Sequence, residues 1–90
     1  MNKERRKKLA SANELLDEIR DKLGEVQDIV DECKSEEEDY RDNMPENMQN
    51  SDKYYAADSA VEEMESAYDA LSEMIDNLDE ISSNIEAAQE

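Results

Sequence analysis

The chain has 90 residues, of which 41% are charged and 37% hydrophobic, and it contains one Gly, one Pro and no His, Trp or Phe. This composition is typical of long helices rather than sheets, and the length allows one domain at most. The formal net charge of −17 disfavours nucleic acid and anionic membranes as partners and favours basic proteins.

The first expected element is a helix from about residue 3 to 43. With Leu9 as heptad position a, nine of its ten a and d positions are apolar, and Glu37 is the exception. These positions are Leu9, Ala12, Leu16, Ile19, Leu23, Val26, Val30, Cys33, Glu37 and Tyr40. Such strict spacing favours a left-handed seam, meaning a row of a and d side chains that meets a facing helix. The same regularity argues against disorder, the competing interpretation of a highly charged chain.

Two residues of this helix need a separate interpretation. Cys33 is at a d position, so we expect a buried small hydrophobic side chain rather than a nucleophile. A single cysteine cannot form an internal disulfide, which points to a reducing compartment. Gly24 is at a b position, where we expect a tolerated surface glycine that costs about 1 kcal/mol relative to Ala. Close contact with another chain is the alternative for Gly24.

The second expected element is a turn over residues 44 to 51. Pro45 cannot continue the first helix without losing a hydrogen bond, and it suits the first position of a new short turn. Met44 and Met48 are four residues apart. We expect these two side chains to close the end of the core.

The third expected element is a helix from about residue 52 to 88, with Asn50 or Ser51 as its N-cap. Only Ser82 is polar among its ten a and d positions, which are Tyr54, Ala57, Val61, Met64, Tyr68, Leu71, Ile75, Leu78, Ser82 and Ile85. The g positions are all apolar, namely Ala60, Ala67, Met74, Ile81 and Ala88. An a/d/g face has the width expected inside a helical bundle.

The two apolar series have the same length, since each covers 31 residue steps, from Leu9 to Tyr40 and from Tyr54 to Ile85. The sequence therefore predicts an all-α, coiled-coil-like antiparallel two-helix hairpin that forms a single domain over residues 1 to 90. One facing helix would leave the apolar g side chains partly exposed, among them Leu15, Ile29, Met74 and Ile81. We therefore expect a homodimer that forms a four-helix bundle.

Charge is unevenly distributed along the chain. From Tyr54 to Glu90 there are eleven acidic residues and no Lys or Arg. Six of the acidic residues recur every three or four positions and are expected to form one carboxylate row on the second helix. This row, the acidic stripe, comprises Glu62, Glu65, Asp69, Glu73, Asp76 and Glu80.

Positive charge is concentrated at the N-terminus, where residues 3 to 8 include five of the ten basic residues. In a hairpin this segment lies beside the acidic C-terminus, so we expect Lys7 and Lys8 to pair with Glu86 or Glu90. The alternative is a basic arm that binds nucleic acid or a membrane. We expect no signal peptide, because the segment leads into an amphipathic run rather than a continuous apolar one.

The chemistry needed for catalysis is missing from the sequence. Without His there is no His-dependent triad or di-metal helical site, and a single Gly excludes glycine-rich phosphate loops. We expect no enzyme activity, no metal site and no cofactor. Among the four tyrosines only Tyr55 falls off the seam, next to the turn, where an exposed tyrosine would suit a protein contact.

The turn segment Asp42 to Ser51, DNMPENMQNS, resembles the link of short acidic helical hairpins encoded by bacteriophages and prophages. Their second helix carries repeats similar to MIDNLDEI at Met74 to Ile81. The resemblance implies a phage or mobile-element origin, and the group has no assigned activity. It carries over no functional residues.

These observations predict a phage-encoded inhibitor or accessory protein in the cytoplasm of a bacterial host cell. The acidic stripe would engage a basic, nucleic-acid-binding protein, in the manner of phage DNA mimics. Direct binding to nucleic acid or a membrane is not expected. The alternative function is a structural or scaffolding oligomer whose acidity serves only solubility.

Overall fold

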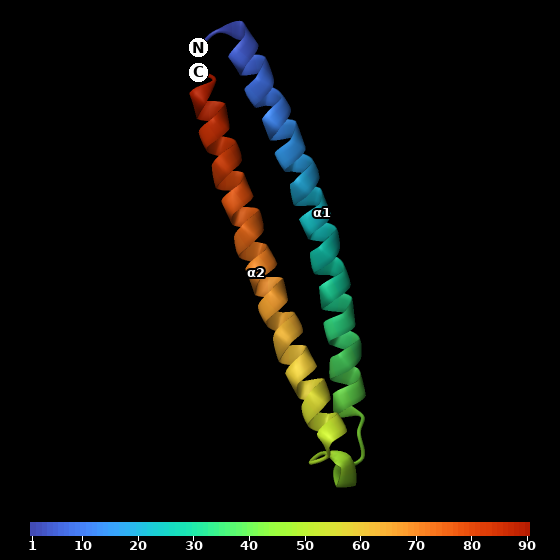
Figure 1. Ribbon diagram of the computed structural model, residues 1–90. Coiled ribbons are helices and arrows are strands. Elements are labelled where there is room, and N and C mark those ends of the chain that lie inside the picture. Colours follow the sequence, from blue (N-terminus) through green and yellow to red (C-terminus); the bar gives the residue numbers. More distant parts are fainter. The chain divides into compact units, whose positions relative to one another are not determined.

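The computed structural model describes all 90 residues and contains helices without strands. Helix α1 comprises Lys3–Asp42, the 3-10 helix η1 comprises Glu46–Met48, and helix α2 comprises Asp52–Ala88. The prediction of an all-α chain with two long helices that pack against each other is confirmed (Figure 1).

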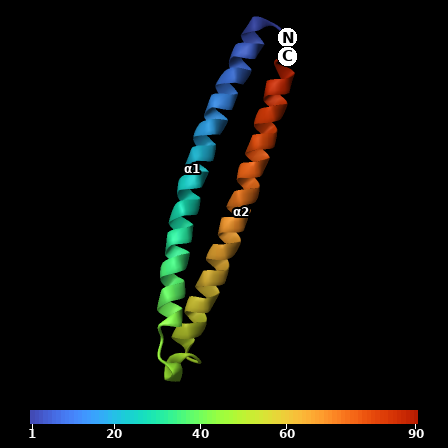
Figure 2. The ribbon, with the colours of Figure 1, turned by 180° about the vertical axis from the view of Figure 1, so that it is seen from behind.

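The chain divides into two compact units, each built from a part of α1 and a part of α2. In each unit the two helical segments lie side by side, as the opposite views of Figures 1 and 2 agree. Unit 1 comprises residues 1–25 and 71–90, and unit 2 comprises residues 26–70.

Unit 1 contains both termini, and its helical segments run antiparallel. The side-chain amide of Asn13 donates a hydrogen bond of 3.4 Å to the carbonyl oxygen of Ser82. Further along α1, Nε of Arg20 lies 3.1 Å from Oδ1 of Asp79. The partner on α2 moves to a lower residue number as the number on α1 rises, which defines the antiparallel direction. No side chain of this unit is fully buried.

Unit 2 contains the turn, and its helical segments are also antiparallel. The side-chain amide of Gln27 donates to the carbonyl oxygen of Tyr68 at 3.3 Å. Nη1 of Arg41 lies 2.9 Å from Oδ1 of Asp58. All three buried side chains of the protein belong to this unit, and they are Met44, Ala57 and Val61.

Each end of α1 has a local cause. At the start, Oδ1 of Asn2 accepts a hydrogen bond of 2.9 Å from the backbone N–H of Arg5. This bond satisfies one of the helix's free N-terminal donors. At the other end α1 stops at Asp42, where the sequence spacing suggested residue 43. Pro45, three residues later, has an extended backbone with φ −58° and ψ 150°, so the helical path does not resume there.

The turn folds as a single short helical turn over the end of unit 2. The backbone N–H of Met48 donates to the carbonyl oxygen of Pro45 at 2.8 Å. Met44 is buried with 8% of its surface exposed, and Met48 is half-buried. The expectation that the two methionines close the core is met most fully by Met44.

The N-cap of α2 is Ser51, one of the two residues predicted for this role. Its Oγ accepts a hydrogen bond of 3.3 Å from the backbone N–H of Tyr54 and donates one of 2.6 Å to the carbonyl oxygen of Met48. The cap therefore ties the start of α2 to the end of η1. Asp52, in the first turn, interacts favourably with the positive end of the helix dipole.

The face that α1 presents to α2 differs from the predicted one. The a positions are half-buried as expected, for example Leu16 and Val30. The d positions from Ile19 onward are exposed, whereas most of the e positions are half-buried. The exposed d residues are Ile19, Val26, Cys33 and Tyr40. The prediction that Cys33 and Tyr40 are core residues is therefore wrong.

The reason for the difference is that α1 is turned about its axis toward its e side. Position e lies about 40° from a, on the side opposite to d. Long polar side chains at e, such as Arg20 and Arg41, reach acidic residues of α2. On α2 the predicted seam is confirmed, because its a and d residues are buried or half-buried, apart from Tyr68 at 36% exposure.

Candidate functional site

The acidic stripe lies on the solvent side of α2. All six of its carboxylate side chains are exposed, and none belongs to any of the five ion pairs of the structure. Glu62, Glu65 and Asp69 belong to unit 2, and the other three belong to unit 1. The structure thus leaves the whole predicted set free to contact another molecule.

The spacing of the stripe residues on α2 determines their geometry. Steps of three and four residues put successive Cβ atoms roughly 5–6 Å apart on one side of a helix. The 18 residue steps from Glu62 to Glu80 correspond to about 27 Å of helix axis. They occupy b, e and f positions, away from the apolar g positions of the same helix.

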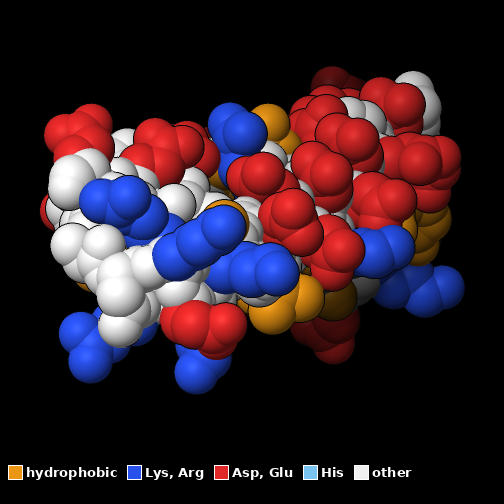
Figure 3. Space-filling view, turned by 90° about the horizontal axis from the view of Figure 1, so that it is seen from above, with side chains coloured by type: hydrophobic (Ala, Val, Ile, Leu, Met, Phe, Trp, Pro, Cys, Tyr) orange, Lys and Arg blue, Asp and Glu red, His pale blue; other side chains and the backbone are white.

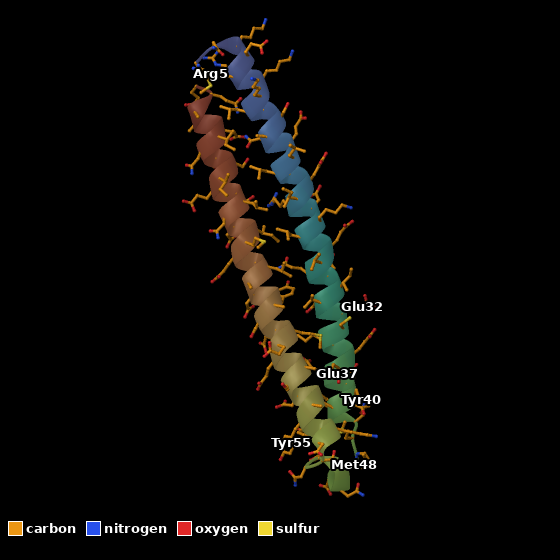
Figure 4. The ribbon with its side chains drawn as sticks, viewed as in Figure 1. Arg5, Glu32, Glu37, Tyr40, Met48 and Tyr55 are labelled. Carbon is orange, nitrogen blue, oxygen red and sulfur yellow. The ribbon has the colours of Figure 1, made fainter.

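The basic N-terminal segment is exposed and makes no ion pair. The expected pairing of Lys7 and Lys8 with Glu86 or Glu90 is absent. Figure 3, the view from above, shows most of the Lys and Arg side chains in its left half and most of the Asp and Glu side chains in its right half. Arg5 lies at the N-terminal end of α1 (Figure 4).

Tyr55 is exposed beside the turn, as predicted, with 56% of its surface accessible. Its hydroxyl donates a hydrogen bond of 3.4 Å to Oδ1 of Asn50. Its ring meets the ring of Tyr54 edge-on, with centroids 5.9 Å apart and an interplanar angle of 82°. These contacts orient the ring without covering it, so Tyr55 is available as an aromatic contact at the turn.

Arg41 is the most highly connected charged residue of the structure, and the sequence reasoning missed it. Its Nε lies 3.0 Å from Oδ1 of Asp42, while its Nη1 reaches Asp58 on α2. The hydrogen bond to Asp42 raises the pKa of the Arg41 guanidinium, partial desolvation opposes this, and Asp58 adds to the rise. The guanidinium stays charged and holds the two helices together next to the turn.

The sequence carried a signal for this arrangement. Long polar side chains recur every seven residues at the e positions of α1, which are Asn13, Arg20, Gln27, Lys34 and Arg41. The two cross-helix ion pairs both join an e position of α1 to an e position of α2. Charges at e are known to set helix pairing and orientation. The prediction considered only the apolar a, d and g positions, so it did not include these polar e positions.

The rotation of α1 leaves apolar side chains uncovered in both units. We call these the open apolar face of each unit. Leu15 and Ile29 are 59% and 61% exposed. In unit 1 the face comprises Leu15, Ile19, Met74 and Ile81, and in unit 2 it includes Val26, Ile29, Cys33 and Tyr40.

No three Cys, Asp or Glu side chains converge in a way that suits a metal ion. Neither helix has an apolar stretch sufficient to cross a lipid bilayer.

Comparison of this chain with protein-family models, with curated proteins and with solved structures gives no match.

Proposed function

We propose that this chain is a non-catalytic protein-binding module whose acidic stripe engages a basic, nucleic-acid-binding surface of a partner protein. The observation that carries the proposal is the full exposure of six carboxylates without a cationic partner. No Lys or Arg follows Lys53 on α2. Like charges at these spacings destabilise a helix by about 0.2–0.5 kcal/mol per pair, and a basic partner would relieve that repulsion.

The charge density of the stripe fits an inhibitor or accessory protein that imitates nucleic acid. The stripe presents one carboxylate per about 5 Å of helix axis. One strand of DNA carries one phosphate per about 3.4 Å. A groove that binds a phosphate backbone through Lys and Arg would therefore meet a similar, somewhat weaker, line of negative charge. Neighbouring acidic residues of α2, such as Glu63, add to the field.

We further propose that the chain is a homodimer in which the open apolar faces of two copies meet in a four-helix bundle. The chain exposes 6814 Å², whereas a compact protein of 10.4 kDa exposes about 5,400 Å². The excess of about 1,400 Å² is larger than the roughly 800 Å² that each partner buries in a standard interface. The stripe lies on another side of α2, so such a dimer leaves it accessible.

The test uses the protein as bait in a bacterial lysate, at low and at high salt, with the captured proteins identified. The variant bait carries Glu62→Gln, Asp69→Asn, Glu73→Gln, Asp76→Asn and Glu80→Gln. We expect the wild-type bait to retain a basic nucleic-acid-binding protein that high salt releases, since salt screens exposed charges. The variant should bind that protein at least about tenfold more weakly, because five exposed charge contacts are lost.

A matched control changes the net charge by the same amount, but its five substitutions are on α1. It carries Glu14→Gln, Asp17→Asn, Asp21→Asn, Asp28→Asn and Asp31→Asn, and all five side chains are exposed in the structure. We expect this control to bind like the wild-type protein. If both variants lose binding equally, net charge rather than the stripe is responsible. If neither loses it, the stripe is not the binding site.

The second candidate function is a scaffolding oligomer, and the open apolar faces favour it. In that case captured proteins would be retained at high salt, because apolar contacts are not weakened by screening. Binding would then respond to changes at Leu15 or Ile29 instead of the stripe.

A further inference from the structure

The open apolar face of each unit lies on the side away from its cross-helix ion pair. In both units a cross-helix ion pair joins the e positions, namely Arg20 with Asp79 and Arg41 with Asp58. When two antiparallel helices meet with their e positions on one side, their g positions lie together on the other side. One face of each unit is therefore polar and internally paired, and the opposite face is apolar and open.

The borders of this face differ between the two helices. On α1 the c and g positions carry six acidic residues and two basic ones, a net charge of −4. Those residues are Glu4, Glu18, Glu25, Glu32, Glu36, Asp39, Lys8 and Lys22. Figure 4 shows Glu32 directed away from α2, toward solvent. On α2 the same positions carry only Lys53 and Glu63, so their net charge is zero.

Two copies can meet face to face about either of two symmetry axes. A two-fold axis along the helices places α1 of one copy on α2 of the other, and like units face each other. A two-fold axis across the helices places α1 on α1 in opposite directions, and unit 1 of one copy faces unit 2 of the other.

The border charges discriminate between these arrangements. Packing α1 on α1 brings two borders of net charge −4 together, while the two neutral borders of α2 meet elsewhere. Packing α1 on α2 places each negative border beside a neutral one. Since like charges across a helix interface are repulsive and help to specify pairing, the second arrangement has the lower electrostatic cost.

We propose that in the dimer α1 of each copy packs against α2 of the other, with unit 1 facing unit 1 and unit 2 facing unit 2. This inference rests on the proposed homodimer and specifies its arrangement. The occupant of the open apolar face is a second copy of this chain. The two turns, which both belong to unit 2, then lie beside each other, and so do the two basic N-terminal segments, which both belong to unit 1.

Spin labels on the full chain can measure this arrangement. In a Cys33→Ala background, Asn47→Cys places one label at the turn, where Asn47 is exposed and makes no side-chain hydrogen bond in the structure. Light scattering first establishes the mass, and pulsed electron paramagnetic resonance then measures the distance between the two labels. We expect roughly 20–35 Å, because neighbouring helix axes are 8–10 Å apart and the labels extend outward.

The alternative arrangement does not give this distance. There the label in unit 2 of each copy lies opposite unit 1 of the other copy, so the two labels do not face each other and the short distance is lost. A second variant, Glu90→Cys in the same background, repeats the measurement in unit 1, so that one poorly folded variant does not decide the result.

The outcomes separate this inference from the dimer on which it rests. A dimeric mass with short distances at both sites supports the proposed arrangement. A dimeric mass without a short distance at either site overturns the arrangement but leaves the dimer. A monomeric mass without dipolar coupling between labels overturns the dimer, and the arrangement with it.

Discussion

Unit 2 contains all three buried side chains of the protein, whereas unit 1 contains none. The difference comes from the turn. In unit 2, Met44 and η1 cover the end of the helix pair. Ala57, whose side chain is small, is 2% exposed in the same unit. In unit 1 the two helical segments pack only against each other, without a turn or short helix that covers them. A bare pair of helices can cover only a narrow row of side chains, so unit 1 has more to gain from a second copy.

The largest effect is expected from placing a charge in the core of unit 2. Val61 is 5% exposed, and Val61→Asp buries a carboxylate without a partner, so we expect a loss of about 3 kcal/mol or more in unfolding free energy. Leu78→Asp, at a half-buried position of unit 1, should cost less. Urea unfolding followed by circular dichroism measures both, with Ser66→Asp on the exposed side of α2 as the control. Equal losses at Val61 and Leu78 would contradict the contrast between the units.

The next effect concerns the open apolar faces. Leu15→Glu in unit 1 and Ile29→Glu in unit 2 each place a charge on the proposed dimer interface, and we expect the mass in light scattering to fall from dimer to monomer. Ser35→Glu, on the outer side of α1, adds the same charge and should leave the dimer intact. Because two chains of net charge −17 repel each other, the wild-type dimer should tighten as salt rises. Dimers that persist in both variants would locate the interface elsewhere.

A moderate and opposite effect is expected at Gly24. A methyl group added at this position meets nothing within 4 Å, and its b position faces away from the open apolar face. Gly24→Ala should therefore stabilise the protein by up to about 1 kcal/mol through helix propensity. Thermal unfolding of the two proteins measures the gain. A loss of stability or of dimer would mean that another chain packs against this glycine.

The smallest effect is expected at the ion pair of unit 1. The side chains of Arg20 and Asp79 are each 51% exposed, so Arg20→Gln should cost less than about 1 kcal/mol. Lys22→Gln removes the same charge from a pair within α1, where the lysine is 79% exposed, and serves as the control. A larger loss for Arg20→Gln than for Lys22→Gln supports a role for the e positions in pairing the helices. Identical losses would remove that role.

Much of the fold followed from local sequence. The sequence predicts Ser51 as a possible N-cap, Met44 as a residue that closes the core, and the six stripe carboxylates as one row on the second helix. Each of these depends on residues within a few positions of one another. Helix propensity, capping and side-chain periodicity are physical effects at that range, so the sequence alone carries them.

The rotation of α1 about its axis could not be predicted from the local sequence. The apolar count placed Cys33 and Tyr40 on the seam, and the structure exposes both. The contacts between the helices on the e side join residues far apart in the chain, such as Arg20 with Asp79 at 3.1 Å. A seven-residue repeat marks several faces of a helix at once, and only the facing helix selects among them.

The sequence by itself therefore determined two helices, the turn between them and an acidic row on α2. The tertiary structure decided which side of α1 meets α2. It turned the polar e positions inward and left the apolar d and g positions open, because ion pairs across the helices satisfy one side while no third helix covers the other. That choice made the apolar face available to a second copy and kept the acidic stripe free.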